Sequence, residues 1–197
     1  MTTWEGDDLG YINLASVRLC TESEGPGKRL ALWVQGCRKR CFGCCNPEMQ
    51  EIKRNIVIDT KDIINMICQS KKDNDIEGIS FIGGEPFLQA GGLSEIAKWA
   101  KNEGLSVLVF SGYLLKELNE MGNPNVELLL QYTDILIDGP FIQERYDNKR
   151  DWVGSTNQKI HFLSNTYQNG IEYQNHYHQM EVLVSENDIL INGWPYF

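Results

Sequence analysis

The feature of this 197-residue chain that most constrains its fold is a regular alternation of short apolar strands with segments of helical periodicity. Strands that alternate with helices form βαβ units, whose strands lie parallel in one sheet. We therefore expect an α/β fold with about four parallel strands, or five if residues 159–163 join them, which is too few for a closed eight-stranded barrel. The expected strands are residues 29–35, 78–82, 105–110 and 134–138, and the expected helices are residues 60–68, 94–103, 114–121 and 126–132.

The two ends of the chain lie outside this alternation. Residues 11–19 have the pattern of a further strand, and the composition changes after about residue 165. In the tail, two short apolar runs at residues 180–184 and 189–191 predict a small β-hairpin. We expect a core domain of residues 1–165 and a C-terminal extension of residues 166–197.

Charge and hydropathy exclude several kinds of partner. The chain carries 27 acidic and 18 basic residues, a net charge of −9, which argues against general nucleic-acid binding. Its apolar runs are shorter than the roughly 18–20 residues of a membrane span. The first eight residues, MTTWEGDD, are acidic rather than apolar and do not resemble a signal peptide. We therefore expect a cytoplasmic protein with neither a membrane nor a nucleic-acid partner.

Four of the six cysteines fall within nine residues: Cys37, Cys41, Cys44 and Cys45. In a reducing compartment, clustered cysteines indicate metal ligands or redox groups rather than disulfides. Three thiols spaced C-x3-C-x2-C suit three irons of a [4Fe–4S] cluster, which leaves the fourth iron open to a substrate. The alternatives are a structural zinc ion, which requires four ligands, and cysteines that are merely buried.

Glycine and polar residues gather where the expected strands end. The carboxyl ends of parallel strands meet at one edge of a sheet, and binding sites in α/β folds form there. We therefore expect four short segments to share one rim: Gly36-Cys37, Gly83-Gly84-Glu85, Ser111-Gly112-Tyr113 and Asp138-Gly139-Pro140.

The cysteine motif, with Phe42 at its aromatic position, resembles the signature of radical S-adenosylmethionine (SAM) enzymes. Further motifs resemble those of the activating proteins of anaerobic ribonucleotide reductase, a family of glycyl radical enzyme activases, and they occur in the family order over residues 11–163. The chain departs from that family at Cys45, where His or Tyr is usual, and at Val153, where Arg is frequent. The matching segments are residues 34–37, 44–48, 82–86, 111–113, 138–141 and 154–158.

This resemblance implies an incomplete parallel β/α barrel of the radical SAM type, followed by the short hairpin-like extension. It implies an enzyme that reductively cleaves SAM to a 5′-deoxyadenosyl radical and generates a glycyl radical on a partner, anaerobic ribonucleotide reductase. Its cofactors would be SAM and a [4Fe–4S] cluster held by Cys37, Cys41 and Cys44. The alternatives are a radical SAM enzyme acting on another peptide or a small molecule, and a non-enzymatic iron–sulfur or zinc protein.

The resemblance also implies a set of SAM contacts. Glycines let a backbone approach a ligand closely, so the Gly83-Gly84-Glu85 turn is expected at the methionine end of SAM. Ser111 is expected near the ribose or the methionine carboxylate, with a helix cap as the alternative. Asp138 is expected near the ribose or the reacting centre, with a turn-stabilising carboxylate as the alternative. Phe42 is expected to shield the cluster. The complete expected set is Phe42, Gly43, Cys45, Gly83, Gly84, Glu85, Ser111, Gly112 and Asp138.

Positive charge is concentrated around the cysteines. Residues 26–54 carry seven basic and two acidic side chains, although the chain as a whole is acidic. Opposite charges steer protein encounters, so we expect this region to dock an acidic electron donor, such as a flavodoxin-like protein. The alternative is a solvated loop surface. The basic residues are Lys28, Arg29, Arg38, Lys39, Arg40, Lys53 and Arg54.

Overall fold

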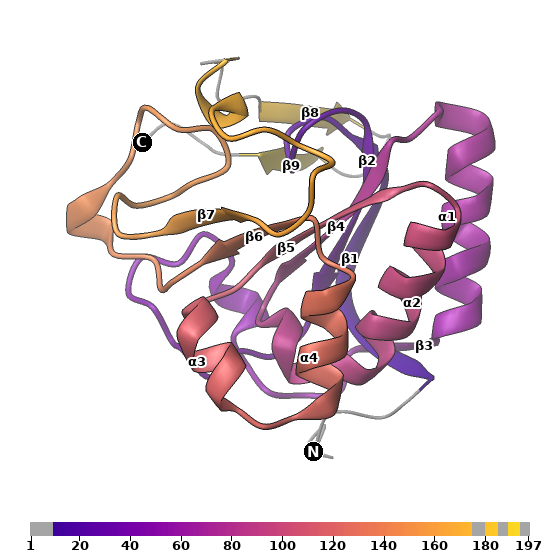
Figure 1. Cartoon of the computed structure of the whole chain (residues 1–197), viewed down its shortest axis with the longest axis horizontal. Helices are drawn as coiled ribbons and strands as arrows, with labels where there is room; N and C mark the ends of the chain where they lie inside the picture. Colours follow the sequence, from indigo (N-terminus) through magenta and orange to yellow (C-terminus); the bar gives the residue numbers. More distant parts are fainter. Residues whose placement is uncertain (1–9, 175–179, 185–188, 194–197) are drawn as a thin grey trace.

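The computed structural model describes residues 10–174, 180–184 and 189–193. Its main sheet has seven strands in the order β3-β1-β2-β4-β5-β6-β7 (Figure 1). The four central strands run parallel, as the sequence predicts. They are β2 (Arg29–Val34), β4 (Gly78–Gly83), β5 (Ser106–Phe110) and β6 (Ile135–Asp138).

The outer strands of this sheet are antiparallel to their neighbours. β1 (Tyr11–Thr21) pairs with both β2 and β3 (Ile56–Asp59), and β3 was not expected from the sequence. β7 (Lys159–Phe162) pairs antiparallel with β6, so the prediction of a fifth parallel strand at these residues is wrong. A parallel neighbour requires a crossover to the far end of the sheet, whereas the chain after β6 turns back at the rim it has just reached.

Four helices cover one face of the sheet (Figure 1). The largest hydrophobic core lies between them and the sheet, where Ile67, Leu93, Ile96 and Leu129 are completely buried. Smaller apolar clusters occupy the opposite face, around Trp33 on β2 and around Leu108 on β5. The helices are α1 (Thr60–Asn74), α2 (Ala90–Asn102), α3 (Leu115–Glu120) and α4 (Pro124–Gln131).

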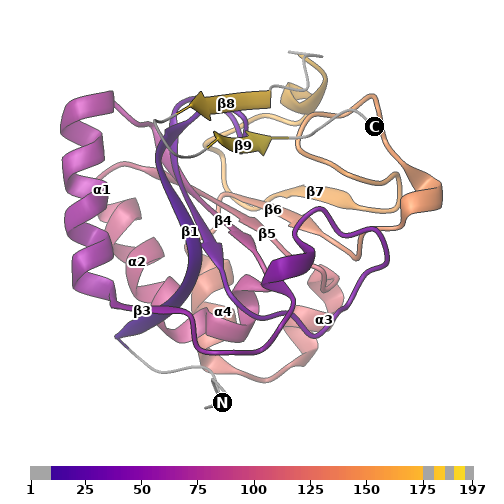
Figure 2. The ribbon, with the colours of Figure 1, turned by 180° about the vertical axis from the view of Figure 1, so that it is seen from behind.

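The C-terminal hairpin consists of β8 (Met180–Val184) and β9 (Ile189–Gly193), which pair antiparallel in a sheet of their own. Figure 2 shows it beside the loop that joins β1 to β2, beyond the amino-terminal ends of the parallel strands. The prediction of an α/β fold with a C-terminal hairpin is confirmed. Within the described part of the chain, no helix is both long and apolar enough to cross a membrane.

Candidate iron–sulfur and cofactor site

The cysteine loop, residues 36–50, starts where β2 ends and closes back on itself. The amide of Gly36 donates to the Met49 carbonyl (2.8 Å), and the amide of Cys37 donates to the Gln50 carbonyl (3.1 Å). The side chain of Gln50 in turn donates to the carbonyl of Cys41 (3.3 Å). The two ends of the loop are thus pinned together, and the three predicted cluster ligands lie between them.

Hydrogen bonds from backbone amides reach all three predicted ligand sulfurs. The amide of Lys39 donates to the sulfur of Cys37, and the amide of Asn46 donates to that of Cys44, each at 3.4 Å. The sulfur of Cys41 interacts with the backbone amide of Phe141, on the loop that follows β6. N–H donors stabilise the thiolate form that binds metals.

The four cysteines of the loop differ in acidity. Burial raises the pKa of the Cys37 and Cys41 thiols. The side chain of Cys45 donates a hydrogen bond to Cys44, which is the main reason that the pKa of Cys44 falls to about 6. The same bond raises the pKa of Cys45 well above its usual value. Cys45 therefore acts as a donor to the third predicted ligand.

The chemistry of these thiols favours a cluster over a single zinc ion. A structural zinc ion takes four ligands, whereas the motif places three half-buried thiols with amide donors on one loop. The adjacent fourth thiol, Cys45, donates to Cys44. Three thiolates on one loop suit a [4Fe–4S] cluster.

Glu85 joins the ends of β4 and β5. Its completely buried carboxylate accepts from the Ser111 hydroxyl (3.0 Å) and the Phe87 amide (3.1 Å) through Oε1, and from the Gly112 amide (2.8 Å) through Oε2. Burial raises its pKa to about 7, against the opposing effect of these hydrogen bonds. Both carboxylate oxygens are therefore engaged by protein donors that hold two strand-end turns together.

Gly83 and Gly84 are required by the protein backbone itself. A Cβ on Gly84 would lie 2.3 Å from the carbonyl oxygen of Gly36, and one on Gly83 would lie 2.6 Å from the amide nitrogen of Val34. Gly83 also has a φ of +99°, which disfavours other residues. The amide of Glu85 donates to the Gly36 carbonyl (2.9 Å). The turn after β4 is thus packed against the start of the cysteine loop.

Lys39 fastens the cysteine loop to the turn after β5. Its ammonium group lies 3.9 Å from the centre of the Tyr113 ring and 3.1 Å from a carboxylate oxygen of Glu117 on α3. A Cβ on Gly112 would lie 2.8 Å from the Lys39 side chain. The Ser111 hydroxyl accepts from the Tyr113 amide (3.0 Å), so it shapes this turn. Ser111 is not the N-cap of α3, because that position is occupied by Leu114.

Asp138, at the end of β6, stabilises the start of α3. Its Oδ2 accepts from the Leu115 amide (2.6 Å), and Nε2 of His161 on β7 lies 2.9 Å from the same oxygen. Its other oxygen, Oδ1, is buried and has no hydrogen-bond partner among the described residues. One acceptor at the rim is therefore suited to a ligand donor, such as a hydroxyl or an ammonium group.

Sequence reasoning assigned no role to three residues that brace the loop after β6. The Asn157 side chain donates to the Pro140 carbonyl (2.8 Å), and the Gln158 side chain donates to the Gly139 carbonyl (3.0 Å). The Ser155 hydroxyl accepts from the Ile142 amide (3.1 Å). These bonds fix the loop whose Phe141 amide meets Cys41. These three residues belong to the 154–158 segment, which resembles a family motif, but the sequence alone did not indicate what their side chains do.

Phe42 and Gly43 occupy the outer part of the cysteine loop. Phe42 is 81% exposed, and its shielding of a cluster stays a prediction. Gly43 has a φ of +69°, and a Cβ there would meet the side chain of Gln143 at 2.5 Å. Cys45 is also exposed.

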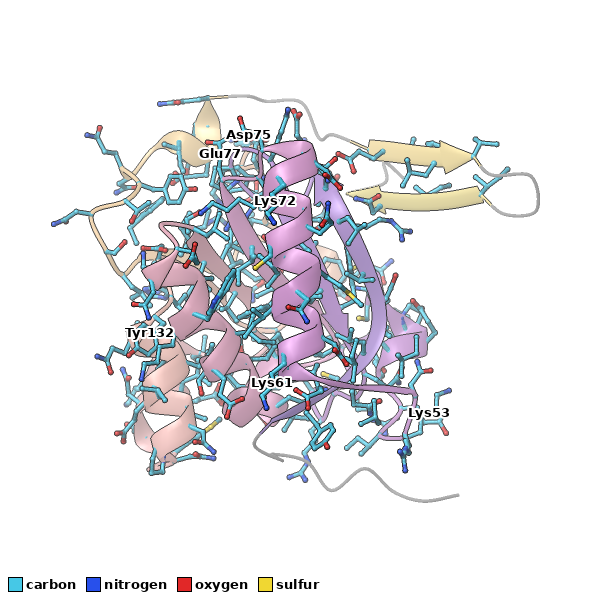
Figure 3. All side chains as sticks on the ribbon, turned by 90° about the vertical axis from the view of Figure 1, so that its right-hand side faces the viewer. Lys53, Lys61, Lys72, Asp75, Glu77 and Tyr132 are labelled. Carbon is cyan, nitrogen blue, oxygen red and sulfur yellow. The ribbon has the colours of Figure 1, made fainter. Side chains whose placement is uncertain are left out.

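Two of the basic residues expected to surround the cysteines lie elsewhere. Arg29 is completely buried at the start of β2 and donates to Ser80 (2.8 Å) and Ser106 (2.9 Å). The carbonyl of its neighbour Lys28 accepts from the Glu77 amide, and Figure 3 places Glu77 at the opposite end of the protein from Lys53. Arg29 and Lys28 precede β2, whereas the cysteine loop follows it, so the expected surface is smaller than the sequence suggested.

The fold and the site together define an iron–sulfur protein. A family model described as a 4Fe-4S single cluster domain matches residues 23–161, more than half of the chain. Three curated relatives are named anaerobic ribonucleoside-triphosphate reductase-activating protein. The one from Vibrio cholerae is 34% identical over 70% of this chain and 89% of its own length. The one from Escherichia coli (strain K12) is 34% identical over 71% and 91%, and that from Enterobacteria phage T4 is 26% identical over 76% and 93%. The chain belongs to the family of anaerobic ribonucleoside-triphosphate reductase-activating proteins.

The buried Glu85 predicts a dependence of stability on pH. Its folded-state pKa of about 7 lies above the usual value of 4.5, so the folded protein binds the proton more tightly than the unfolded chain. This contribution to stability is fully present below pH 4.5 and is lost as the pH rises to about 7. It amounts to about 3 kcal/mol at most. Urea unfolding from pH 4.5 to pH 8 should therefore give a steeper decline for the wild type than for Glu85→Gln.

Burial also raises the pKa of Glu24 to about 7. Because the wild type and Glu85→Gln both retain Glu24, the difference between their two pH profiles reports on Glu85 alone. Glu103→Gln is the control and should follow the wild type, because Glu103, the C-cap residue of α2, is exposed. An equal decline in the wild type and Glu85→Gln would contradict the assignment.

Proposed function

We propose that this protein is a radical SAM enzyme with an incomplete β/α barrel, which generates a glycyl radical on an anaerobic ribonucleotide reductase. The observation that carries the proposal is the meeting of three strand-end loops with the cysteine loop. Gly84 packs on Gly36, the Ser111 turn contacts Lys39, and Phe141 reaches Cys41. The names of the relatives support the choice of partner.

Cys37, Cys41 and Cys44 would hold a [4Fe–4S] cluster with one open iron. When bound, the reduced cluster supplies the electron that splits the sulfonium of SAM into methionine and a 5′-deoxyadenosyl radical. The amides of Lys39 and Asn46 donate to ligand sulfurs, and such donors favour the more negative, reduced state. The chain thus tunes the site through its own backbone.

The SAM-binding residues we propose are those at the rim. Asp138 Oδ1, buried and without a partner among the described residues, would accept from a hydroxyl or ammonium group of SAM. Glu85 would act indirectly, because its carboxylate holds the Ser111 and Gly112 turn in place beside the SAM site. The proposed set also includes Phe42, Gly43, Cys45, Gly83 and Gly84, which lie on the cysteine loop and on the turn after β4.

We further propose that residues 1–165 form the catalytic core and residues 166–197 an extension. The proposed compartment is the cytoplasm, where four cysteines within nine residues remain reduced. A radical SAM enzyme acting on another peptide or a small molecule is the alternative.

Two measurements test this function. The reconstituted protein should produce 5′-deoxyadenosine from SAM when it is reduced with dithionite in the absence of oxygen. Addition of an anaerobic ribonucleotide reductase from the same source should then give the paramagnetic resonance signal of a glycyl radical. Nucleoside formation without a glycyl radical would favour the alternative, and absence of both products would contradict radical SAM chemistry.

We propose a smaller docking surface for the electron donor than the sequence suggested. Arg38 and Arg40 are exposed on the cysteine loop, whereas Lys39 is engaged by Glu117 and Tyr113. Two exposed cations beside the cluster would steer an acidic donor of the flavodoxin-like kind.

Replacing Arg38 and Arg40 together with glutamine should slow reduction by an acidic protein donor about tenfold at low salt, because the steering charge is removed. The same change should flatten the dependence of this rate on ionic strength. Lys71→Gln with Lys72→Gln is the matched control, because both lysines lie in the last turn of α1, and Figure 3 places Lys72 at the opposite end of the protein from Lys53. Stopped-flow reduction measures these rates. An unchanged salt dependence in the arginine variant would show that the charges are only a solvated surface.

A further inference from the structure

Asp138 is a buried carboxylate whose two oxygens differ in their surroundings. Its side chain is only 3% exposed. The amide of Leu115 on α3 donates to Oδ2 (2.6 Å), whereas Oδ1 is buried and makes no hydrogen bond within the described residues. An ionised carboxylate that is removed from water is costly unless a partner compensates its charge. Asp138 therefore needs a cationic partner as well as the Leu115 amide.

His161 on β7 is placed to be that partner. Its Nε2 lies 2.9 Å from Oδ2 of Asp138, and this nitrogen makes no hydrogen bond to any other group of the described chain. In the part of the chain that the structure describes, no lysine or arginine forms an ion pair with Asp138. Asp138 and His161 are thus paired with each other across β6 and β7.

Lys159 shows that the pairing depends on the imidazole and not on strand register alone. Lys159 lies directly opposite Asp138 in the antiparallel ladder, whereas His161 lies opposite Leu136. Lys159 is nevertheless exposed and has no ion pair with the carboxylate in the described structure. The imidazole reaches back along the ladder to Oδ2 instead. The contact is therefore specific to His161.

The chain just before β7 supports the backbone that follows Asp138. The side chains of Asn157 and Gln158 donate to the next two carbonyls after Asp138 in the chain (2.8 and 3.0 Å). The Leu115 amide belongs to the first residue of α3. The carboxylate is therefore held from β7 and from α3, and both contacts are made at Oδ2. Because one oxygen is fixed in this way, the other keeps a single orientation.

Asp138 lies where the proposed SAM contacts meet. One residue before it, the carbonyl of Ile137 accepts from the Ser111 amide (2.8 Å), which joins it to the turn after β5. Three residues after it, the Phe141 amide reaches the sulfur of Cys41. Asp138 thus stands between the turn after β5 and the cysteine loop.

We propose that His161 is a positioning residue of the SAM site. It compensates the charge of Asp138 and fixes Oδ2, so that Oδ1 can accept from a hydroxyl or ammonium group of SAM. This role rests on the proposed function, in which Asp138 contacts SAM. His161 acts through Asp138 and need not touch SAM itself. In metal sites, removing a group that orients a ligand side chain lowers affinity about 10- to 100-fold.

The test is a double-mutant cycle on the dissociation constant of SAM. It is measured by anaerobic calorimetry on the full chain with its cluster oxidised, so that no SAM is cleaved. His161→Phe keeps a ring but removes the nitrogen, and it should raise the dissociation constant about tenfold. His161→Gln, whose amide can donate to the same oxygen, should stay within about threefold of the wild type.

The decisive comparison is made in the Asp138→Asn background, where SAM binding is already weakened. His161→Phe should cause no further loss there, because residues that act as a unit are not additive. His161→Asn is too short to reach Oδ2 and closes the same cycle if the phenyl ring disturbs β7. Lys159→Gln is the matched control, since it removes a charge from the same strand but leaves the contact with Asp138 intact, and it should bind SAM like the wild type.

Iron content and the urea midpoint of unfolding establish that each variant is folded. Unchanged SAM affinity in both His161→Phe and His161→Asn would overturn the role of His161 and leave the proposed function intact. An additive loss in the double variant would also overturn it, because His161 would then act independently of Asp138. A wild-type protein that binds no SAM would contradict the proposed function itself, and the role of His161 would fall with it.

Discussion

Replacing any one of Cys37, Cys41 and Cys44 with alanine is expected to abolish binding of the [4Fe–4S] cluster. Each of these half-buried thiols lies on one closed loop and accepts from a backbone amide, that of Phe141 in the case of Cys41. A cubane held by only two thiolates on this loop would lose a third of its protein ligands, so iron content and visible absorbance should fall to near zero after anaerobic reconstitution. Production of 5′-deoxyadenosine should disappear with them.

Cys45→Ala is the matched control, because Cys45 is adjacent to the motif but donates to Cys44 rather than competing with it. This variant should retain the cluster. Cys68→Ala, on α1, should behave like the wild type. A Cys44→Ala protein with full iron content, together with a Cys45→Ala protein without iron, would move the third ligand to Cys45.

Gly84→Ala is expected to disrupt the cysteine loop as well as SAM binding. The added methyl group would lie 2.3 Å from the carbonyl oxygen of Gly36, and a backbone atom cannot rotate away as a side chain can. Overpacking of this kind costs about 1–3 kcal/mol, and sometimes more. Because Gly36 immediately precedes Cys37, the displacement should lower iron content together with the urea midpoint of unfolding.

Gly112→Ala separates this effect from a general intolerance of side chains at the rim. A Cβ at Gly112 would meet a methylene of Lys39 at 2.8 Å, and this flexible side chain can shift. Its stability and iron content should remain close to those of the wild type. If Gly84→Ala kept both properties and lost only SAM affinity, the glycine would serve the ligand rather than the backbone.

Sequence patterns predicted the parallel strands and the shared rim well, because both follow from local apolar periodicity and from strand direction. They could not predict the direction of β7, since this depends on where the chain turns after Asp138 and on how Asn157 and Gln158 brace that turn. The hairpin was found from its two apolar runs. Its docking through Glu181 and Asn192 could not be predicted, because periodicity gives the two faces of a strand but does not say which face meets the protein.

The same limit applies to single charged residues. Arg29 counted as part of a basic surface, although its guanidinium is completely buried among hydroxyls and carbonyls. Glu85 was interpreted as a ligand contact because it follows two glycines. Its partners, Ser111 and Gly112, are 26 and 27 residues away in sequence, and no local pattern reveals such a pairing.

The anchoring of three rim donors by Glu85 has a consequence for cofactor affinity. The Phe87, Ser111 and Gly112 groups are fixed by one buried carboxylate before any ligand arrives. Binding therefore need not freeze these turns, and the entropy of ordering them is lost during folding rather than during association. A variant that loosens this anchor should lower the affinity for SAM through a more unfavourable binding entropy, while every direct contact is retained. Calorimetry would therefore detect a change that a contact map would miss.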